Sequence, residues 1–352
     1  MLLTLLANRD RTKFEMSVIL PYGSVLAQEV RALGCEAVQA ERIADKSLST
    51  MAVFELKRLL RGLRPDIIHA HACMSARIAA RLFLPRCKIV YTRHSVFDIP
   101  ARNKRFPYKT LSGLFNNAFA DRVIAVSPAA YDNVIDIGIS PEKVAVVFNG
   151  ADRVKRLSTE ERLKIRKTYG IAETDFVCAI IARLEKVKGH IYVIEAFKGL
   201  PQDIKLIIAG KGSEEENLRA AANGMKNCIF AGFVNNIHEI ENIMDVQLNA
   251  SYGTEATSAA LLEGMSLGVP AIVSDFGGNP YVIENGINGV VIPKRSAIAI
   301  KAAIEELKGD SGRYSKMSEN CMRIYQERFT SRAMTVTTER EYMFIYQKEE
   351  KG

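Results

Sequence analysis

The sequence predicts an α/β protein with two doubly wound domains, each built on a parallel sheet covered by helices. Short runs rich in Val and Ile alternate with stretches of helical spacing along the whole chain, which is typical of successive βαβ units. The chain has 352 residues, enough for two domains at roughly 150 residues each. A polar stretch, 149–173, separates the two series of elements. We therefore place the domain boundary there.

The first half opens with residues 1–6, MLLTLL, an apolar helix pattern without an N-cap residue before it. Stretch 51–63 is also expected to be helical, because Val53, Leu56 and Leu60 recur at helical spacing. In a βαβ series a strand precedes each helix, so we expect a further strand and a Gly-rich turn before Met1. The expected strands are 14–20, 35–39, 66–70, 88–92, 122–126 and 144–148.

The second half repeats this scheme and then becomes purely helical after Ser296. Near-continuous apolar runs such as 205–209 are typical of a parallel sheet covered on both faces. Two such sheets leave a cleft at the carboxyl ends of their strands, where ligands usually bind in this class of fold. The expected strands are 176–181, 204–209, 228–231, 245–248, 271–274 and 289–292.

Composition and charge limit the function classes. With 48% hydrophobic and 25% charged residues the chain is neither disordered nor fibrous, and it has no apolar run of about 18 residues. Six scattered cysteines without a C-x-x-C pair indicate neither a disulfide framework nor a zinc site, which favours the cytoplasm. The net charge of +8 lies in residues 1–150, with 21 Lys and Arg against 13 Asp and Glu. Such a basic half can attract nucleic acid, an anionic lipid surface or a phosphorylated substrate.

Segment 249–292 carries the strongest functional signal. A strand ends there, a polar loop carries Glu255, and a helix that starts at about Ser258 carries Glu263. The free amides of that helix's first turn can bind a diphosphate, and a second turn, Gly277-Gly278, follows the next strand. Taken singly, each feature has a plain structural explanation: Ser258 as an N-cap, the glycines as turns, and Glu263 as a solvated residue.

Two further sites precede this segment. Arg183 and Lys188 flank a turn at a strand end, so they can converge on one diphosphate and offset the charge of a departing group. His94 ends a strand of the first domain, where a structural role is the plainer explanation. For His69 and His71 we expect side chains on opposite faces of a strand, and hence no metal-ligand pair.

Together these segments resemble a known family. The chain is similar to retaining glycosyltransferases of the GT-B fold, family 4, also called glycosyl transferases group 1. The resemblance rests on Glu255 and Glu263 in LLEGMSLGVPAIVSDFGG, on ARLEKVKGH, on IAVSPAA and VVFNGAD, and on ENGINGVVIP. It covers residues 1–345, apart from the expected strand before Met1. It implies an acceptor-side domain 1–152, a nucleotide-sugar-binding domain 153–331 facing it across a cleft, and a helix 332–352 that returns to the first domain.

The resemblance also implies roles for individual residues. Arg183 and Lys188 would contact the donor diphosphate, Glu255 and the neighbouring backbone the donor sugar, and Glu263 the ribose hydroxyls. His94 would stand near the anomeric carbon. The resemblance implies that no metal and no cofactor is needed, because the cations and helix amides do the work of a divalent ion. The remaining donor-binding residues would be Gly232, Phe233 and Val234 beside the base, and Thr257 and Ser258 at the start of the helix.

We therefore expect a cytoplasmic, retaining hexosyltransferase that uses a nucleotide-diphospho-sugar and a glycan or lipid-linked acceptor in cell-surface polysaccharide synthesis. The basic stretch 102–109 suits a mobile loop that contacts an anionic membrane surface, and a nucleic-acid partner is not expected. Two alternatives stay open at this point. The chain could be a non-catalytic, nucleotide-sugar-binding partner of an active transferase, or a sugar-nucleotide epimerase that needs no acceptor.

Overall fold

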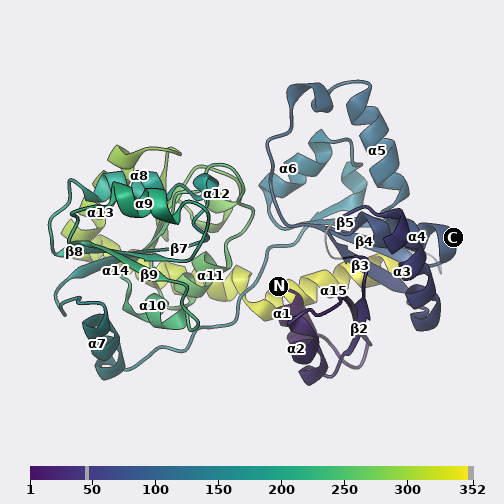
Figure 1. Ribbon diagram of the computed structural model, residues 1–352, viewed down its shortest axis with the longest axis horizontal. Helices are drawn as coiled ribbons and strands as arrows, with labels where there is room; N and C mark the ends of the chain where they lie inside the picture. The colour runs from purple at the N-terminus through teal and green to yellow at the C-terminus, as the bar shows by residue number, and fades with distance from the viewer. Residues whose placement is uncertain (44–46, 348–352) are drawn as a thin grey trace. The chain divides into compact units, whose positions relative to one another are not determined.

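A computed structural model describes residues 1–43 and 47–347 of the chain (Figure 1). They form two compact units. Unit 1 contains residues 1–150 together with the C-terminal segment that begins at Ser331, and unit 2 contains residues 151–330. Both units consist of parallel strands with helices against them, as the sequence predicts. Within the described residues, no helix combines the length and the apolar character needed to cross a bilayer.

Unit 1 contains two parallel sheets, β1-β2 and β3-β4-β5-β6. The apolar segment 1–6, which the sequence predicts as a helix, is helical from Leu2 onward, with Leu5 and Leu6 buried. The strands are β1 (Ser17–Pro21), β2 (Glu36–Ala40), β3 (Ile67–His71), β4 (Lys88–Arg93), β5 (Arg122–Ala125) and β6 (Val144–Val146). The helices are α1 (Leu2–Asn8), α2 (Leu26–Ala32), α3 (Thr50–Leu63), α4 (Met74–Phe83), η1 (Ala101–Lys104), α5 (Tyr108–Ala118), α6 (Pro128–Asp136), η2 (Pro141–Lys143) and α15 (Ser331–Gln347).

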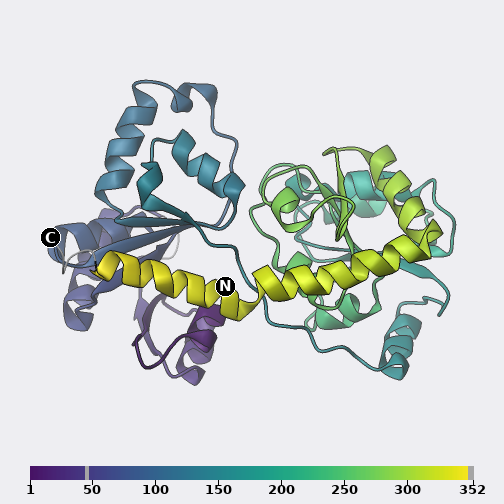
Figure 2. The same cartoon turned by 180° about the vertical axis from the view of Figure 1, so that it is seen from behind.

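The C-terminal helix α15 is part of unit 1, although it follows unit 2 in the chain. Figure 2 shows it lying along the β3–β6 sheet, beside α1. Met334, Tyr342 and Ile345 of α15 pack with Val90 and Ile124 of that sheet in one buried cluster. Tyr342 of α15 also reaches β3, where its hydroxyl lies 2.6 Å from His69 Nδ1.

Two predicted elements of unit 1 differ most from the structure, whereas the other predicted strands there lie within two residues of the observed bounds. Strand β1 begins at Ser17, three residues later than predicted, because residues 11–13 form a turn and the Phe14 ring packs on Tyr342 of α15, 5.8 Å between ring centroids. The basic stretch 102–109 is not a loop: it contains most of η1 and the start of α5. The expectation of a further strand before Met1 stays a prediction.

Unit 2 has one six-stranded parallel sheet in the order β12-β11-β10-β7-β8-β9, which places β7 and β10 side by side at its centre. The strands are β7 (Phe176–Ile181), β8 (Ile204–Ala209), β9 (Cys228–Gly232), β10 (Val246–Asn249), β11 (Ala271–Ser274) and β12 (Gly289–Ile292). The helices are α7 (Thr159–Thr168), η3 (Lys186–Lys188), α8 (His190–Phe197), α9 (Glu215–Ala221), α10 (His238–Ile243), α11 (Ala259–Ser266), α12 (Asn279–Val282), α13 (Ala297–Gly309), α14 (Ser311–Ile324) and the π-helical turn η4 (Tyr325–Phe329).

Apolar side chains cover both faces of the unit 2 sheet, which explains its uninterrupted apolar strands. Alternate residues of β7 illustrate this: Cys178 and Ile180 belong to the cluster that includes α8 and α13, whereas Val177 and Ala179 belong to the cluster that includes α10. Polar side chains are therefore few within these strands, Lys205 of β8 and Gln247 of β10 being two exceptions. The carboxyl ends of β7 and β10 are where the predicted donor residues lie.

Candidate functional site

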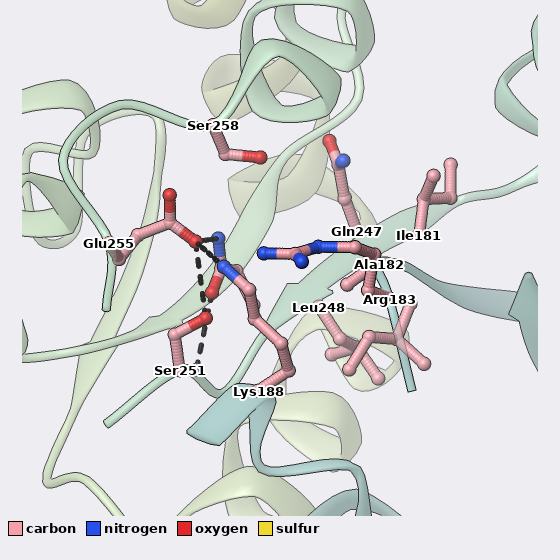
Figure 3. Close-up of a pocket in the computed structure, with 11 residues that line it drawn as sticks. Ile181, Ala182, Arg183, Lys188, Gln247, Leu248, Ser251, Glu255 and Ser258 are labelled. Atoms are coloured by element: carbon pink, nitrogen blue, oxygen red, sulfur yellow. Dashed lines mark hydrogen bonds and ion pairs between the residues drawn. The ribbon is translucent and has the colours of Figure 1, made fainter. Parts of the chain in front are cut away.

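A pocket of about 190 Å³ opens in unit 2 at the carboxyl ends of β7 and β10 (Figure 3). Four of the residues predicted from the sequence line it: Arg183, Lys188, Glu255 and Ser258. They come from two segments of the chain, the one that follows β7 and the one that follows β10, and the close-up shows the Lys188 and Glu255 side chains turned toward each other. The structure thus brings the predicted cations and the predicted carboxylate into one hollow.

Lys188 and Glu255 form an ion pair inside this pocket. Lys188 Nζ donates to Glu255 Oε2 at 2.9 Å and to the carbonyl oxygen of Thr254 at 3.1 Å. The two side chains are only 14% and 10% exposed. A pair so shielded from water interacts more strongly than a surface ion pair, so each partner holds the other in a defined position.

A glycine turn places Lys188 against the loop that follows β10. Gly189 has a φ of 74°, in the left-handed region, and an added Cβ would lie 2.2 Å from the carbonyl oxygen of Ala250. The backbone amide of Tyr252 donates to the carbonyl oxygen of Val187 at 2.8 Å, which ties the same two segments together. Glycine is required here because any side chain would push the Lys188 turn away from the loop.

The Gly277-Gly278 turn supports Glu255 from the other side. An added Cβ would lie 2.0 Å from the Glu255 carbonyl oxygen at Gly277, and 1.4 Å from the Ala256 carbonyl oxygen at Gly278. The Gly278 amide also donates to the carbonyl oxygen of Glu255 at 3.2 Å. The turn that we interpreted as a second phosphate turn therefore contacts the backbone of the segment that carries Glu255.

Sequence reasoning missed three polar residues of this pocket. Asn249 Nδ2 and Ser251 Oγ both donate to Glu255 Oε2, at 3.3 and 3.1 Å, so this oxygen accepts from three side chains. Gln247 also lines the pocket, and its buried Oε1 has no hydrogen-bond partner among the described residues. Polar residues at 247 and 249 interrupt an otherwise apolar strand two residues apart. That spacing was the available signal, since it puts both side chains on one face.

Helix α11 begins at the pocket. Its N-cap residue is Ser258, as the sequence predicts, yet the Ser258 side chain makes no capping hydrogen bond. The Thr257 hydroxyl donates to the carbonyl oxygen of Ala256 at 2.8 Å. The amides of the first turn, together with Arg183 and Lys188, form the positive side of the site, and such a helix start is suited to a phosphate group.

Glu263, which the resemblance assigns to the ribose, is half-buried on α11 and has an acidic neighbour that sequence analysis did not identify. Glu241 on α10 is fully buried. Burial, followed by the charge of Glu263, raises the pKa of Glu241 to about 9, so its carboxyl is protonated at neutral pH. His238 Nδ1 lies 2.7 Å from Glu241 Oε2. A neutral Glu241 therefore adds no negative charge beside Glu263.

The other donor-side residues lie around the same strand ends. Arg183 has a side chain that is 72% exposed and pairs with Glu185 at 2.6 Å. Gly232 ends β9 with a φ of 68°, and the following Phe233 is 68% exposed, whereas Val234 packs on the cluster around α10. Phe233 therefore offers an exposed ring beyond the end of β9, and Arg183 is held mainly by its charged neighbour.

His94 lies in unit 1, directly after β4, near His69 and His71 of β3. The positions of these two β3 histidines differ from our prediction. We expected His69 and His71 on opposite faces of a strand, and this was wrong: residues i and i+2 share a face, and the two ring centroids lie 4.3 Å apart. His71 Nδ1 lies 2.7 Å from His94 Nε2. In the part of the chain that the structure describes, no group of three or more His, Cys, Asp or Glu residues is arranged to hold a metal ion. A reaction without metal stays a prediction.

Two family models match the chain. The one described as "Glycosyl transferases group 1" matches residues 161–323, and the one described as "Glycosyltransferase Family 4" matches residues 3–155. The two matches fall on unit 2 and unit 1, respectively. Each unit of the structure is therefore recognised separately.

Comparison with individual proteins likewise finds similarity to glycosyltransferases. A putative glycosyltransferase, EpsD of Bacillus subtilis, is 28% identical over 79% of this chain and 74% of its own length. The UDP-Gal:alpha-D-GlcNAc-diphosphoundecaprenol alpha-1,3-galactosyltransferase of Escherichia coli is 28% identical over 77% of this chain and 73% of its own. Among solved structures, Anabaena Alr3699/HepE in complex with UDP superposes with a TM-score of 0.81 at 20% identity, covering 97% of this chain and 95% of that one. This likeness concerns the fold.

Proposed function

We infer that the chain belongs to the GT-B glycosyltransferases of the group 1 and family 4 type, because the two family models match residues 3–155 and 161–323. From that premise we propose that it is a retaining hexosyltransferase, which moves a sugar from a nucleotide diphosphate to a glycan or lipid-linked acceptor in cell-surface polysaccharide synthesis. The observation that best supports this proposal is the pocket of unit 2, where Lys188, Arg183 and the first turn of α11 surround one space beside Glu255. Cations and helix amides suit a diphosphate, and a carboxylate suits sugar hydroxyls.

The proposed reaction breaks the bond between the anomeric carbon and the diphosphate oxygen. The acceptor hydroxyl oxygen bonds to the same carbon from the same face, and its proton passes to the departing phosphate oxygen. Lys188 and Arg183 offset the negative charge that grows on the diphosphate, which is the work a divalent cation does in other enzymes. Glu263 would accept hydrogen bonds from the ribose, the exposed Phe233 ring would stack on the base, and His94 of unit 1 would contact the sugar.

The names of similar proteins guide the choice of substrates to test. The Escherichia coli relative is named for UDP-galactose and for an acceptor on diphosphoundecaprenol, and the Anabaena structure holds UDP. We therefore propose a UDP-sugar as donor and a diphosphate-linked lipid or glycan as acceptor. A thermal-shift series with UDP, GDP and ADP tests the base, because a ligand stabilises in proportion to its occupancy. The largest shift is expected with UDP.

A transfer assay then tests the chemistry. We expect transfer from a UDP-hexose to survive excess EDTA, and NMR of the product to show the anomeric configuration of the donor. An inverted product would refute retention, and loss of transfer with EDTA that Mg²⁺ restores would refute a metal-independent reaction. UDP binding without transfer to any lipid-diphosphate or glycan acceptor would instead identify the chain as the non-catalytic partner subunit considered above.

We also propose that unit 1 binds an anionic membrane surface, with the protein on the cytoplasmic side. Gly113 seats α5 on Gly138, where an added Cβ would lie 2.4 Å from the Gly138 carbonyl oxygen. The other side of the helix exposes Leu111 by 62% and Leu114 by 66%, and Phe106 just before it by 83%. Apolar side chains flanked by cations are typical of helices that lie in the membrane interface.

Exposed cations lie beside this apolar face. Arg102 and Arg105 are exposed, whereas Lys104 pairs with Asp136 at 2.5 Å. Each cation near an anionic surface contributes roughly 1 kcal/mol of binding free energy, and exposed Leu and Phe side chains add the hydrophobic part. A lipid-linked acceptor would be reached at such a surface.

Vesicle co-sedimentation tests the membrane proposal. We expect binding to vesicles with anionic phospholipid, weak binding to phosphatidylcholine alone, and loss of binding in the double variant Leu111→Ser/Leu114→Ser. Leu82→Ser is the matched control, because Leu82 is 61% exposed on α4. Equal binding of wild type and double variant would refute the role of α5, and self-association of the wild type that the double variant loses would identify a second copy as its partner.

A further inference from the structure

Three histidine rings gather at the carboxyl ends of β3 and β4. His69 and His71 lie on β3, and His94 follows β4. The His69 and His71 ring centroids are 4.3 Å apart with planes at 31°, and those of His71 and His94 are 5.0 Å apart with planes at 26°. The rings therefore form one row, with His71 tilted against His69 and stacked on His94, the residue that we propose contacts the donor sugar.

Each end of the row is hydrogen-bonded differently. His69 uses both ring nitrogens on the protein: Nδ1 lies 2.6 Å from the Tyr342 hydroxyl and Nε2 lies 2.5 Å from the Thr92 hydroxyl. His71 Nδ1 lies 2.7 Å from His94 Nε2. Within residues 1–43 and 47–347, His94 Nδ1 makes no hydrogen bond, and the His94 side chain is half-buried. The free nitrogen of the row is therefore His94 Nδ1.

All three rings are neutral near pH 7. Burial lowers the pKa of His71 to about 4, and burial likewise lowers the pKa of His94 to about 4. Burial also lowers the pKa of His69, with further contributions from His71 and His94. Between two neutral imidazoles a hydrogen bond has one proton, so the tautomer of one ring determines that of the other. The contact between His71 and His94 thus orients the His94 ring and couples the tautomer of His94 to that of His71.

We propose that His71 is a positioning residue for sugar transfer, because it holds Nε2 of His94 and thereby presents Nδ1 of His94 to a hydroxyl of the donor sugar. The proposal rests on the proposed function, since it needs His94 to contact the sugar. His69, fixed by Thr92 and by Tyr342 of α15, supports the other face of the His71 ring. Three separate segments, β3, β4 and α15, therefore build the support of a single imidazole.

The alternative is that the row is only packing. In that case removing the nitrogens of His71 would change stability and leave the tautomer of His94 unchanged. A positioning role makes the opposite prediction, because one nitrogen of His71 matters more than the volume of its ring. Two substitutions separate these cases: His71→Phe keeps a ring and loses Nδ1, whereas His71→Asn loses the ring and keeps a polar atom near the place of Nδ1.

Kinetics with a UDP-hexose provide the first readout. We expect His71→Phe to lower kcat about 10- to 100-fold, the effect of misplacing one group near the reacting atoms, with the donor KM within twofold. His71→Asn should regain most of that loss. The melting-temperature shift by UDP should be unchanged in both, because the pocket with Lys188 and Glu255 belongs to unit 2. Wild-type kcat in His71→Phe would overturn the proposal.

The imidazole ¹⁵N spectrum provides a readout that does not depend on activity. In the wild type we expect one tautomer of His94, seen as separate pyrrole-like and pyridine-like nitrogen shifts, and in His71→Phe two averaged shifts. If the wild-type protein shows no transfer with any donor, the proposed function fails while this spectrum still tests the hydrogen bond. If neither variant folds, a wild-type His94 with averaged shifts would by itself overturn the proposal, and a single tautomer would support it.

Discussion

Replacing Lys188 by Ala tests the catalytic role of the unit 2 pocket most directly. Lys188 Nζ is an already placed cation, held by Glu255 and the Thr254 carbonyl and only 14% exposed. Removing one preorganised electrostatic donor typically costs about 2.7–4 kcal/mol in the activation barrier, or about 10²–10³ in kcat. We expect a loss of that size in transfer from the donor.

Lys188→Ala should also lower the free energy of unfolding, and the hydrogen bonds of Glu255 indicate by how much. Glu255 Oε2 would keep two neutral donors, Asn249 and Ser251, and lose its charged one. The loss of a hydrogen bond to a charged group corresponds to about 1.5–3 kcal/mol. In Lys188→Met/Glu255→Gln no unpaired carboxylate is left, so the melting temperature should recover while turnover stays low. Recovery of stability without activity separates the two roles.

The assay combines turnover, UDP affinity by calorimetry and melting temperature. Lys186→Ala is the matched control: Lys186 lies in the same turn and is exposed. It should keep turnover within about twofold, since it does not line the pocket. Wild-type-like turnover of Lys188→Ala would refute the assigned role of the ammonium group, and an equal loss in Lys186→Ala would show that only the total charge of the turn matters.

Three further predictions concern the surroundings of the site. Gly278→Ala should weaken UDP-sugar binding at least tenfold, because its Cβ would lie 1.4 Å from the Ala256 carbonyl oxygen. Gly309→Ala is the control, because Gly309 has open space around it, and its affinity measured by calorimetry should equal that of the wild type. Equal affinities of the two variants would contradict the close packing at Gly278. Glu241→Gln should raise the melting temperature by several degrees at pH 8 and little near pH 4.5. The reason is that the pKa of Glu241 is about 9 in the folded state and 4.5 in the unfolded state, so wild-type stability falls as pH rises between these values. A variant less stable than the wild type at pH 8 would refute this. His71 and His94 have pKa values of about 4 in the folded state and 6.5 in the unfolded state, so the unfolded chain binds more protons between these values. The free energy of unfolding should therefore fall as pH drops from 6.5 to 4. A melting temperature that stays constant over that range would be inconsistent with neutral buried rings.

The sequence alone determined the strands of unit 2 to the residue in several places. Strands β7, β8, β11 and β12 have the predicted bounds because each is an apolar run that ends at a polar residue or a turn. Local patterns also located Glu255 after a strand and Ser258 as the N-cap of α11. These features depend on neighbours within a few residues, so periodicity and capping chemistry are sufficient to find them. Stretch 102–109 shows the limit, since its basic residues conceal the start of α5.

Only the tertiary structure decided which side chains meet. Lys188 and Glu255 are 67 residues apart in the chain, and their pairing depends on β7 lying beside β10 in the sheet. The neutral state of Glu241 requires α10 to bury it against Glu263, and the nitrogen of His94 that remains free is selected by His71. Hydrogen bonds, burial and pKa shifts arise from atoms a few ångströms apart in space. Sequence spacing carries no information on such distances until the strand order is known.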